Sequence, residues 1–197
     1  HFRSNISDFE RASSGWLKAD SKKTSVLRRK LKSHKNDKII GISWFTRAKK
    51  VTSQLRNVPI DLFSNFLKKL PATYVNLQYG ETTEELSQIR SKSGLEVKQI
   101  ENLDLFNDLD GLAALISACD IVISIDNATV HLAGALGVDA KILLPFDAEE
   151  RWGLNSNKSY WYDNVTLYRQ DTLRDWNQPL ENLVYDIKNM KFYSDKN

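Results

Sequence analysis

The chain has 197 residues, of which 41% are hydrophobic and 27% charged, which is enough for one large globular domain or two small ones. No apolar run approaches the length of a membrane span, and Cys119, the only cysteine, excludes an internal disulfide bond. The formal net charge of +3 is local in origin, because residues 18–38 hold nine Lys or Arg against Asp20 and Asp37. No aromatic residues are interleaved with these cations, so we expect a solvated helix face and no nucleic-acid partner.

The chain opens without Met and without the apolar core of a signal peptide, and we expect it to be a segment of a longer protein. Residues 8–35 alternate apolar and charged positions at helical spacing, which predicts one or two lead-in helices within residues 1–37. The apolar run from Ile39 to Trp44 then predicts a first central strand.

A long polar segment, Thr46 to Asn57, follows this first strand. Long loops at the carboxyl end of a strand are often functional. Arg47 and Arg56 can neutralise phosphate groups there or act as ordinary surface cations, whereas Lys49 and Lys50 are better explained as solvated cations.

Strands and helices alternate along the rest of the chain, which predicts right-handed crossovers and a parallel sheet covered on both faces. We therefore expect an α/β fold, a Rossmann-like doubly wound parallel sheet of about six strands over residues 38–190, with a frayed tail at 191–197. The expected elements after the loop are a helix opened by Pro59 and closed by Pro71, strand 73–78, helix 82–92 ended by Gly94, a weak strand 97–100, a helix from Asp110, strand 121–125, a helix after it, strand 140–144, strand 165–169 and helix 176–190.

The stretch from Asp120 to Gly137 has the most informative pattern. A β-branched run, 121–125, predicts a buried strand, and Asp126 and Asn127 follow it at the place of a helix cap. The unpaired N–H groups and the dipole at such a helix start favour an anion, so the turn can hold a phosphate group. An ordinary helix cap explains the same residues about equally well.

In an open parallel sheet, ligands bind beyond the carboxyl ends of the strands. This rule selects four segments: 43–47, 78–81, 126–131 and 146–152. Within them, His131 either packs locally in its helix or donates to a ligand, Asp126 is a cap or a site residue, and Arg151 and Trp152 form a stacked pair or part of a lid.

Several common chemistries lack their motifs in this chain. Neither Gly-x-Gly-x-x-Gly nor a Walker phosphate loop occurs, which disfavours a dehydrogenase and a nucleoside triphosphatase. His1, His34 and His131 have no metal-ligand spacing, so we expect no metal site. There is also no Gly-x-Ser-x-Gly elbow for a serine hydrolase.

A combination of motifs resembles the carboxyl-terminal domain of bacterial two-Rossmann-domain (GT-B) glycosyltransferases, in particular heptosyltransferase-like proteins and glycosyltransferases that follow tetratricopeptide repeats. These motifs run in order from about residue 16 to 187. They are Trp-Leu-Lys-Ala-Asp (16–20), Gly-Ile-Ser-Trp (41–44), Asp-Asn-Ala-Thr-Val-His-Leu-Ala-Gly-Ala-Leu-Gly (126–137), Leu-Pro-Phe (144–146), Arg-Trp (151–152), Trp-Tyr (161–162), Leu-Tyr-Arg-Gln (167–170) and Asp-Trp (175–176).

The resemblance implies a domain that binds the nucleotide-diphosphate-sugar donor of an inverting, metal-independent transfer, in the cytoplasm or at the inner face of the membrane. It implies no cofactor, a glycan or protein acceptor that the resemblance does not specify, and a partner half of the same protein, an acceptor or repeat domain, which supplies the general base. The donor-binding residues that it implies are Ser43, Trp44, Arg47, Gln78, Tyr79, Asp126, Asn127, Ala128, Thr129, His131, Arg151 and Trp152.

Two positions depart from the family pattern. Asn127 stands where Thr or Ser is usual, and Phe45-Thr46 stands where Arg-Gly is common, which weakens the assignment of Arg47. The alternative is a non-catalytic module that keeps this fold and binds a nucleotide, a sugar or a protein.

Overall fold

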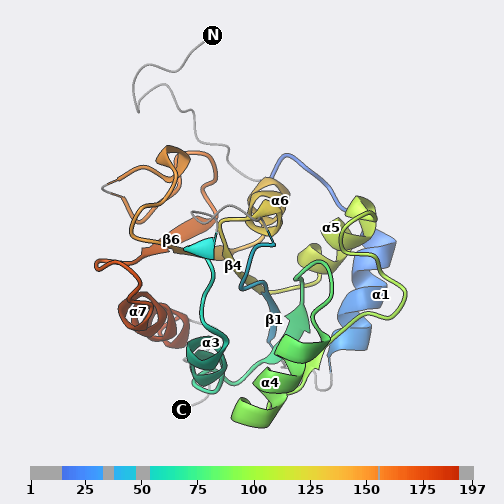
Figure 1. Ribbon diagram of the computed structural model, residues 1–197. Coiled ribbons are helices and arrows are strands. Elements are labelled where there is room, and N and C mark those ends of the chain that lie inside the picture. The colour runs from blue at the N-terminus through green and yellow to red at the C-terminus, as the bar shows by residue number, and fades with distance from the viewer. Residues whose placement is uncertain (1–14, 33–37, 48–53, 155, 191–197) are drawn as a thin grey trace.

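A six-stranded, all-parallel sheet forms the centre of the computed structural model, which describes residues 15–32, 38–47, 54–154 and 156–190 (Figure 1). The strand order is β3-β2-β1-β4-β5-β6. The strands are β1 (Ile39–Ile42), β2 (Thr73–Asn76), β3 (Val97–Lys98), β4 (Ile121–Ile125), β5 (Ala140–Leu144) and β6 (Val165–Arg169). The expected Rossmann-like α/β sheet is therefore confirmed, with the order reversing between β1 and β4.

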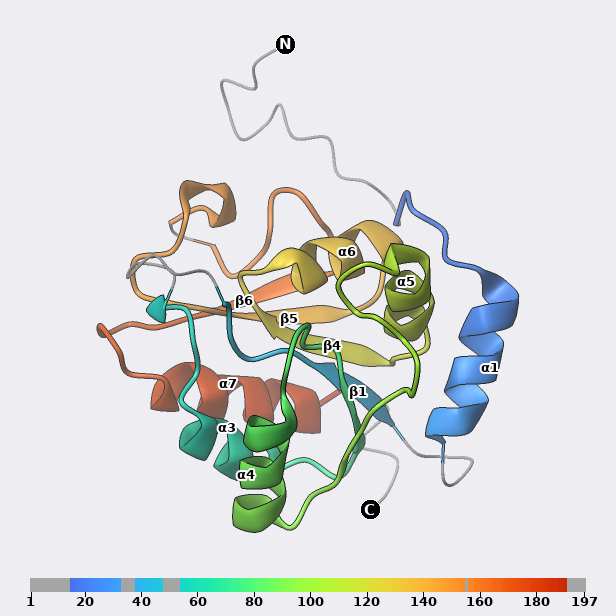
Figure 2. The same ribbon diagram turned by 45° about the vertical axis from the view of Figure 1, so that its right-hand side comes forward.

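Helices cover both faces of the sheet (Figure 2). Helices α3 (Ile60–Leu67), α4 (Thr83–Ser93) and α7 (Asn177–Lys188) lie on one face, and α5 (Leu109–Ser117) and α6 (Ala128–Leu136) lie on the other. A short 3-10 helix, η2 (Glu150–Trp152), follows β5. Because helices cover both faces, β1, β4 and β5 are buried at every position, which explains why their sequences are mostly apolar.

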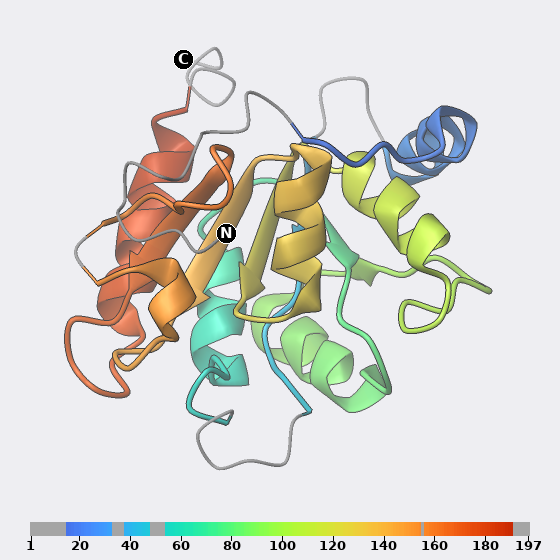
Figure 3. The same cartoon turned by 90° about the horizontal axis from the view of Figure 1, so that it is seen from above.

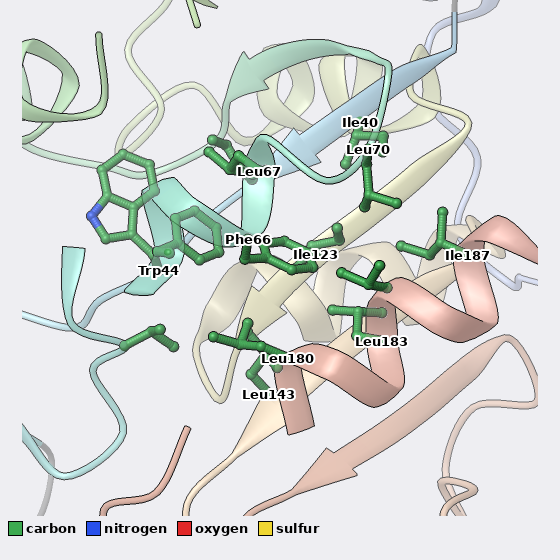
Figure 4. Packing of buried hydrophobic residues seen from close by; sticks show 14 of the residues in the cluster. Ile40, Trp44, Phe66, Leu67, Leu70, Ile123, Leu143, Leu180, Leu183 and Ile187 are labelled. Atoms are coloured by element: carbon green, nitrogen blue, oxygen red, sulfur yellow. The ribbon is translucent and has the colours of Figure 1, made fainter. Parts of the chain in front are cut away.

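The core is split by the sheet into two hydrophobic clusters. Alternate residues of one strand enter opposite clusters, so Ile40 and Ile42 pack with α3 and α7, whereas Ile39 packs with α5 and α6. Figure 4 shows the first cluster, in which Leu180 and Leu183 of α7 meet side chains of the strands and of α3.

Helix α1 (Ser21–Leu31) begins at Asp20, whose side chain accepts a hydrogen bond from the Lys23 N–H at 2.8 Å. It packs against α5, and Leu31 is buried in the second cluster. Arg28 anchors it further, donating to the Ala118 carbonyl oxygen at 2.6 Å and to Asp120 at 2.5 Å. Figure 3 shows α1 (blue) and α7 (red) at opposite sides of the sheet.

Most element boundaries agree with those expected from the sequence. Strands β4, β5 and β6 have the predicted bounds, and α4 ends at Gly94, which takes the left-handed conformation with φ 72°. The predicted helix from Asp110 starts one residue earlier, capped by Asp108. The strands expected at 39–44, 73–78 and 97–100 are shorter in the structure, at 39–42, 73–76 and 97–98.

Some expectations fall outside the described residues: any helix over residues 8–14, the loop cations Lys49 and Lys50, and the tail at 191–197. In the described part of the chain, no helix combines the length and the apolar character needed to cross a membrane.

Candidate functional site

The candidate site lies at the carboxyl ends of β1 and β4, where the strand order of the sheet reverses. In doubly wound sheets this switch point opens the crevice in which ligands bind. A hydrogen bond of 2.7 Å from the Asn127 side-chain amide to the Ser43 hydroxyl joins the two strand ends. The structure thus brings together two of the predicted site residues that are 84 positions apart in the chain.

Asn127 caps helix α6. Its side-chain oxygen accepts hydrogen bonds from the Thr129 N–H and from the Ser124 hydroxyl, both at 3.0 Å. The Oδ1 and the Nδ2 atoms of Asn127 are therefore both hydrogen-bonded within the protein. Ala128, the first helical residue, is exposed, whereas Thr129 is buried. A ligand that approaches the helix start meets the backbone at Ala128 and the positive end of the helix dipole.

Gln78 holds the chain that leaves β1. Its side chain is 1% exposed, and its Oε1 atom accepts three hydrogen bonds: from the Ser43 hydroxyl at 2.9 Å and from the N–H groups of Trp44 and Phe45, each at 3.2 Å. Gln78 itself is fixed through its N–H, which donates to Asn76 Oδ1 at 2.9 Å. The structure thus places the predicted residue Gln78 beneath the site, where it sets the shape of the loop that borders it.

Asp126 ends β4 with a carboxylate that is only 4% exposed. Arg56 Nη1 lies 3.3 Å from Asp126 Oδ2, and His131 Nε2 lies 3.8 Å from Oδ1. Burial alone would raise the pKa of Asp126. The contacts from His131 and from the Trp152 indole N–H, together with the positive charges of Arg56 and Arg151, outweigh burial and hold this pKa below its ordinary value. The Trp152 N–H faces the carboxylate without reaching full hydrogen-bond geometry.

Two arginines converge on one carboxylate beside Asp126. Arg56 Nη2 donates to Glu149 Oε1, and Arg151 Nη2 donates to Glu149 Oε2. Arg56 also lies 3.4 Å from the Asp126 carbonyl oxygen, so it bridges the end of β4 and the segment after β5. Hydrogen bonding from Arg151 is the main cause of the lowered pKa of Glu149. At neutral pH the cluster therefore holds two cations and two carboxylates.

An aromatic stack supports His131 on its other side. The imidazole lies on the indole of Trp152 with ring centroids 5.1 Å apart, and its Nδ1 atom is 3.1 Å from the Tyr162 hydroxyl. Tyr162 in turn stacks on Trp16 at 5.5 Å. A Cβ atom at Gly134 would lie 2.6 Å from the Tyr162 ring, so this glycine allows the ring to sit against α6.

A pocket of about 260 Å³ opens beyond β2 and β3, next to the chain that carries Gln78. Phe106 lies on its wall and is 68% exposed, and its ring centroid lies 5.9 Å from that of the predicted residue Tyr79. The Asp104 carboxylate on the same wall accepts hydrogen bonds from Asn107 and from the Phe106 N–H, which lower its pKa. This pocket offers a flat apolar surface beside a carboxylate.

Two predicted residues lie apart from the carboxylate cluster. The Trp44 indole, expected to line the cleft, is 1% exposed and packs on Phe63 in the core, with centroids 5.9 Å apart. Arg47 is exposed, lies over the Phe45 ring at 5.1 Å and crosses Gly80 on the β2 side of the edge. Among the residues that the structure describes, no group of three or more His, Cys, Asp or Glu side chains is arranged to hold a metal ion.

Sequence reasoning did not predict Glu149, Asp104 or Phe106 as site residues, and it named Trp16 and Tyr162 only as parts of family motifs. Glu149 is paired with a residue 93 positions away, and both partners lie in irregular segments with no periodicity to align them. The family motif Trp-Tyr at 161–162 pointed to Tyr162 as part of the resemblance, but its contact with His131 follows only from the folded chain.

The lowered pKa of Asp126 gives a pH prediction. A carboxylate whose pKa is lower in the folded state stabilises that state above the unfolded value of about 4, and this stabilisation is lost as the pH falls through the folded pKa. We therefore expect Asp126→Asn to reduce the free energy of unfolding by about 1–3 kcal/mol at pH 7, with the difference shrinking below about pH 4. Urea titrations between pH 3 and 7 measure it. The same change at exposed Asp171 should have little effect, and a difference for Asp126→Asn that widens in acid would contradict the prediction.

Comparisons with known proteins bear on the fold. No family model matches the chain. Protein FlbA of Caulobacter vibrioides is 32% identical to it over 137 residues, which are 70% of this chain but 23% of FlbA. The chain thus spans about a quarter of the length of this relative.

Two solved structures resemble the chain. The glycosyl transferase family 9 structure from Veillonella parvula matches with a TM-score of 0.63 and 13% identity, over 94% of this chain and 56% of that one. The ADP-heptose lps heptosyltransferase II structure of E. coli matches with a TM-score of 0.62 and 14% identity, over 87% and 54% respectively. The chain therefore has a glycosyltransferase-like fold that corresponds to about half of each of these two structures.

Proposed function

We propose that this domain binds the nucleoside diphosphate sugar donor of an inverting glycosyltransferase, and that it is the carboxyl-terminal half of the catalytic unit. One observation carries the proposal: the exposed start of α6 at Ala128 lies directly after Asp126 and Asn127 at the switch point, with His131, Arg56 and Arg151 around it. Helix starts and guanidinium groups both favour phosphate oxygens.

The proposed chemistry follows from where the charges lie. An acceptor hydroxyl or amine attacks the anomeric carbon from the side opposite the diphosphate, the bond from that carbon to the diphosphate oxygen breaks, and the configuration inverts. The N–H groups at the start of α6 and the arginines then stabilise the charge that develops on the departing diphosphate. The base that takes the acceptor proton comes from the other half of the enzyme.

The nucleoside fits the pocket beyond β2 and β3. Tyr79 and Phe106 offer ring faces on which a base can stack, and Asp104 is an acceptor for a sugar hydroxyl or a base amino group. We propose that the acceptor site and any repeat domain lie outside these 197 residues; the correspondence of the chain to about half of each similar structure supports this.

A second candidate, a non-catalytic module of the same fold, is favoured by one observation. Asp126 and Glu149 already neutralise Arg56 and Arg151, and Asn127 uses its carboxamide within the fold. A domain that no longer binds a ligand would also have these charges and hydrogen bonds paired within the protein.

Ala128→Glu separates a domain that binds a diphosphate at the start of α6 from a module that has lost this site. A carboxylate at the first helical position is compatible with the helix dipole, so the fold should keep its stability, yet it repels a diphosphate at the helix start. We expect one of ADP, UDP, GDP or CMP, or a sugar conjugate of it, to raise the melting temperature of the chain, and Ala128→Glu to weaken that ligand by at least roughly ten-fold.

The matched control is Asn177→Glu, which adds the same charge at the exposed first position of α7, on the opposite face of the sheet. It should leave the ligand affinity unchanged. If none of these nucleotides stabilises the chain, or if the two variants bind equally well, the donor-binding proposal is wrong and the non-catalytic module is favoured.

A further inference from the structure

The contacts of Glu149 point to a role in ligand selection that the motifs do not indicate. Its two carboxylate oxygens are divided between two cations, Oε1 to Arg56 and Oε2 to Arg151. A phosphate group presents the same paired oxygens to guanidinium groups, so a carboxylate held in this way occupies the place of a phosphate.

Arg56 is fixed in position before any ligand contact is considered. Its side chain is 23% exposed, and Nη1 lies 3.3 Å from the buried Asp126 carboxylate and 3.4 Å from the Asp126 carbonyl oxygen. Its other terminal nitrogen, Nη2, faces Glu149. Asp126 precedes the first residue of α6 by two positions, so Arg56 is anchored at the turn that leads into the helix.

Arg151 approaches from the segment after β5. Its carbonyl oxygen accepts a hydrogen bond from the Trp161 indole N–H at 3.1 Å, which fixes the backbone, and its side chain is 46% exposed. Glu149 itself is 38% exposed. Because the Glu149 carboxylate is partly exposed to solvent, its ion pairs are weaker than they would be around a buried carboxylate such as that of Asp126.

We infer that Arg56 and Arg151 clamp one phosphate group of the ligand, and that Glu149 competes for the clamp, so that multiply charged anions are selected over single ones. The inference rests on the proposed function, since it assigns residues to the same diphosphate. Two partly exposed ion pairs are a smaller barrier for the diphosphate of a sugar nucleotide, which carries two negative charges, than for a monoanion. Glu149 is thus a specificity-determining residue.

Glu149→Gln tests the inference. The amide keeps the size of the side chain and removes its charge, so both arginines become available to the ligand. We expect the 197-residue chain carrying Glu149→Gln to bind inorganic pyrophosphate about five-fold more tightly than the unsubstituted protein in a calorimetric titration. This change corresponds to the loss of two weak, partly exposed ion pairs. Arg56→Gln and Arg151→Gln should each weaken pyrophosphate by roughly ten-fold.

Glu150→Gln is the matched control, because it removes the same charge from the exposed neighbouring residue. It should leave the affinity within about two-fold of the unsubstituted protein, since Arg56 and Arg151 pair with Glu149 and the Glu150 charge is exposed to solvent. The double variant Arg56→Gln/Glu149→Gln should bind pyrophosphate little more tightly than Arg56→Gln alone, because one of the two clamp arginines is then missing.

Equal affinities of the Glu149→Gln variant and the unsubstituted protein would overturn the clamp, as would weaker binding by Glu149→Gln, which indicates a purely structural ion pair. Absence of pyrophosphate binding in every variant would also overturn it. If nucleotides bind and Ala128→Glu blocks their binding while Glu149→Gln has no effect, the clamp proposal is wrong and the proposed function stands. If no nucleotide binds to the unsubstituted protein or to any variant, the proposed function is wrong.

Discussion

Gln78→Leu is expected to lower the free energy of unfolding by about 3 kcal/mol. Leucine has no acceptor, so the Ser43 hydroxyl and the N–H groups of Trp44 and Phe45 lose the oxygen that binds all three of them. The site is 1% exposed, which leaves little water to replace that oxygen. Urea titration monitored by tryptophan fluorescence measures the change.

Gln99→Leu is the control for this variant, since it makes the same substitution at an exposed position beyond β3. We expect its effect to stay within about 0.5 kcal/mol. A loss at Gln78 no larger than the loss at Gln99 would show that the chain after β1 does not depend on this side chain.

Trp152→Ala is expected to cost about 3–5 kcal/mol of stability, the usual range for removal of a fully buried tryptophan. The Trp152 side chain is 0% exposed, belongs to the cluster beneath α5 and α6, and is the surface on which His131 stacks. The variant should therefore also free the imidazole to move away from Asp126. Thermal or urea unfolding measures the first effect, and the NMR chemical shifts of the His131 ring protons measure the second.

Two further variants make the Trp152 prediction sharper. Trp161→Ala, at 44% exposure, removes the same side chain from the same segment and should cost clearly less. Trp152→Phe keeps a ring under His131 but removes the indole N–H that faces Asp126, so it should raise the pKa of Asp126 while keeping most of the stability. A Trp152→Ala variant as stable as Trp161→Ala would contradict the packing described here.

The elements of the fold were predictable where local pattern and tertiary environment agree. β5 is apolar except for Lys141, β6 has mostly buried residues with Thr166 and Arg169 partly exposed, and both strands have the predicted bounds. Lys141 is accommodated because its ammonium group reaches Asp139 at 2.8 Å and Thr166 at 3.2 Å. Edge strand β3 is shorter than predicted and pairs with β2 at only two positions.

The site was predictable in its place but not in its connections. The rule for parallel sheets located the segments after β1, β2, β4 and β5, and the structure brings Ser43 and Asn127 into contact there. The rule does not say which way a side chain points. Trp44 leaves β1 toward α3 and enters the core, and Gln78 turns inward to the loop that it supports.

The ion cluster shows why the rest could not be predicted. Arg56 and Glu149 lie in different loops, 93 residues apart, and each residue by itself resembles an ordinary surface charge. Only the packing of both loops around the end of β4 turns them into partners. The same holds for Tyr162, whose contact with His131 depends on the space left by Gly134.

The central claim is that a phosphate group binds at the start of α6. The most direct test is an NMR titration of the ¹⁵N-labelled chain with the nucleoside diphosphate that stabilises it most, following the backbone amides of Asn127, Ala128 and Thr129. We predict that these amides shift together with the Arg56 and Arg151 side-chain signals, and that the Tyr79 and Phe106 amides shift only when a nucleoside is attached to the diphosphate. Shifts confined to another surface, with the α6 amides unchanged at saturation, would contradict the account.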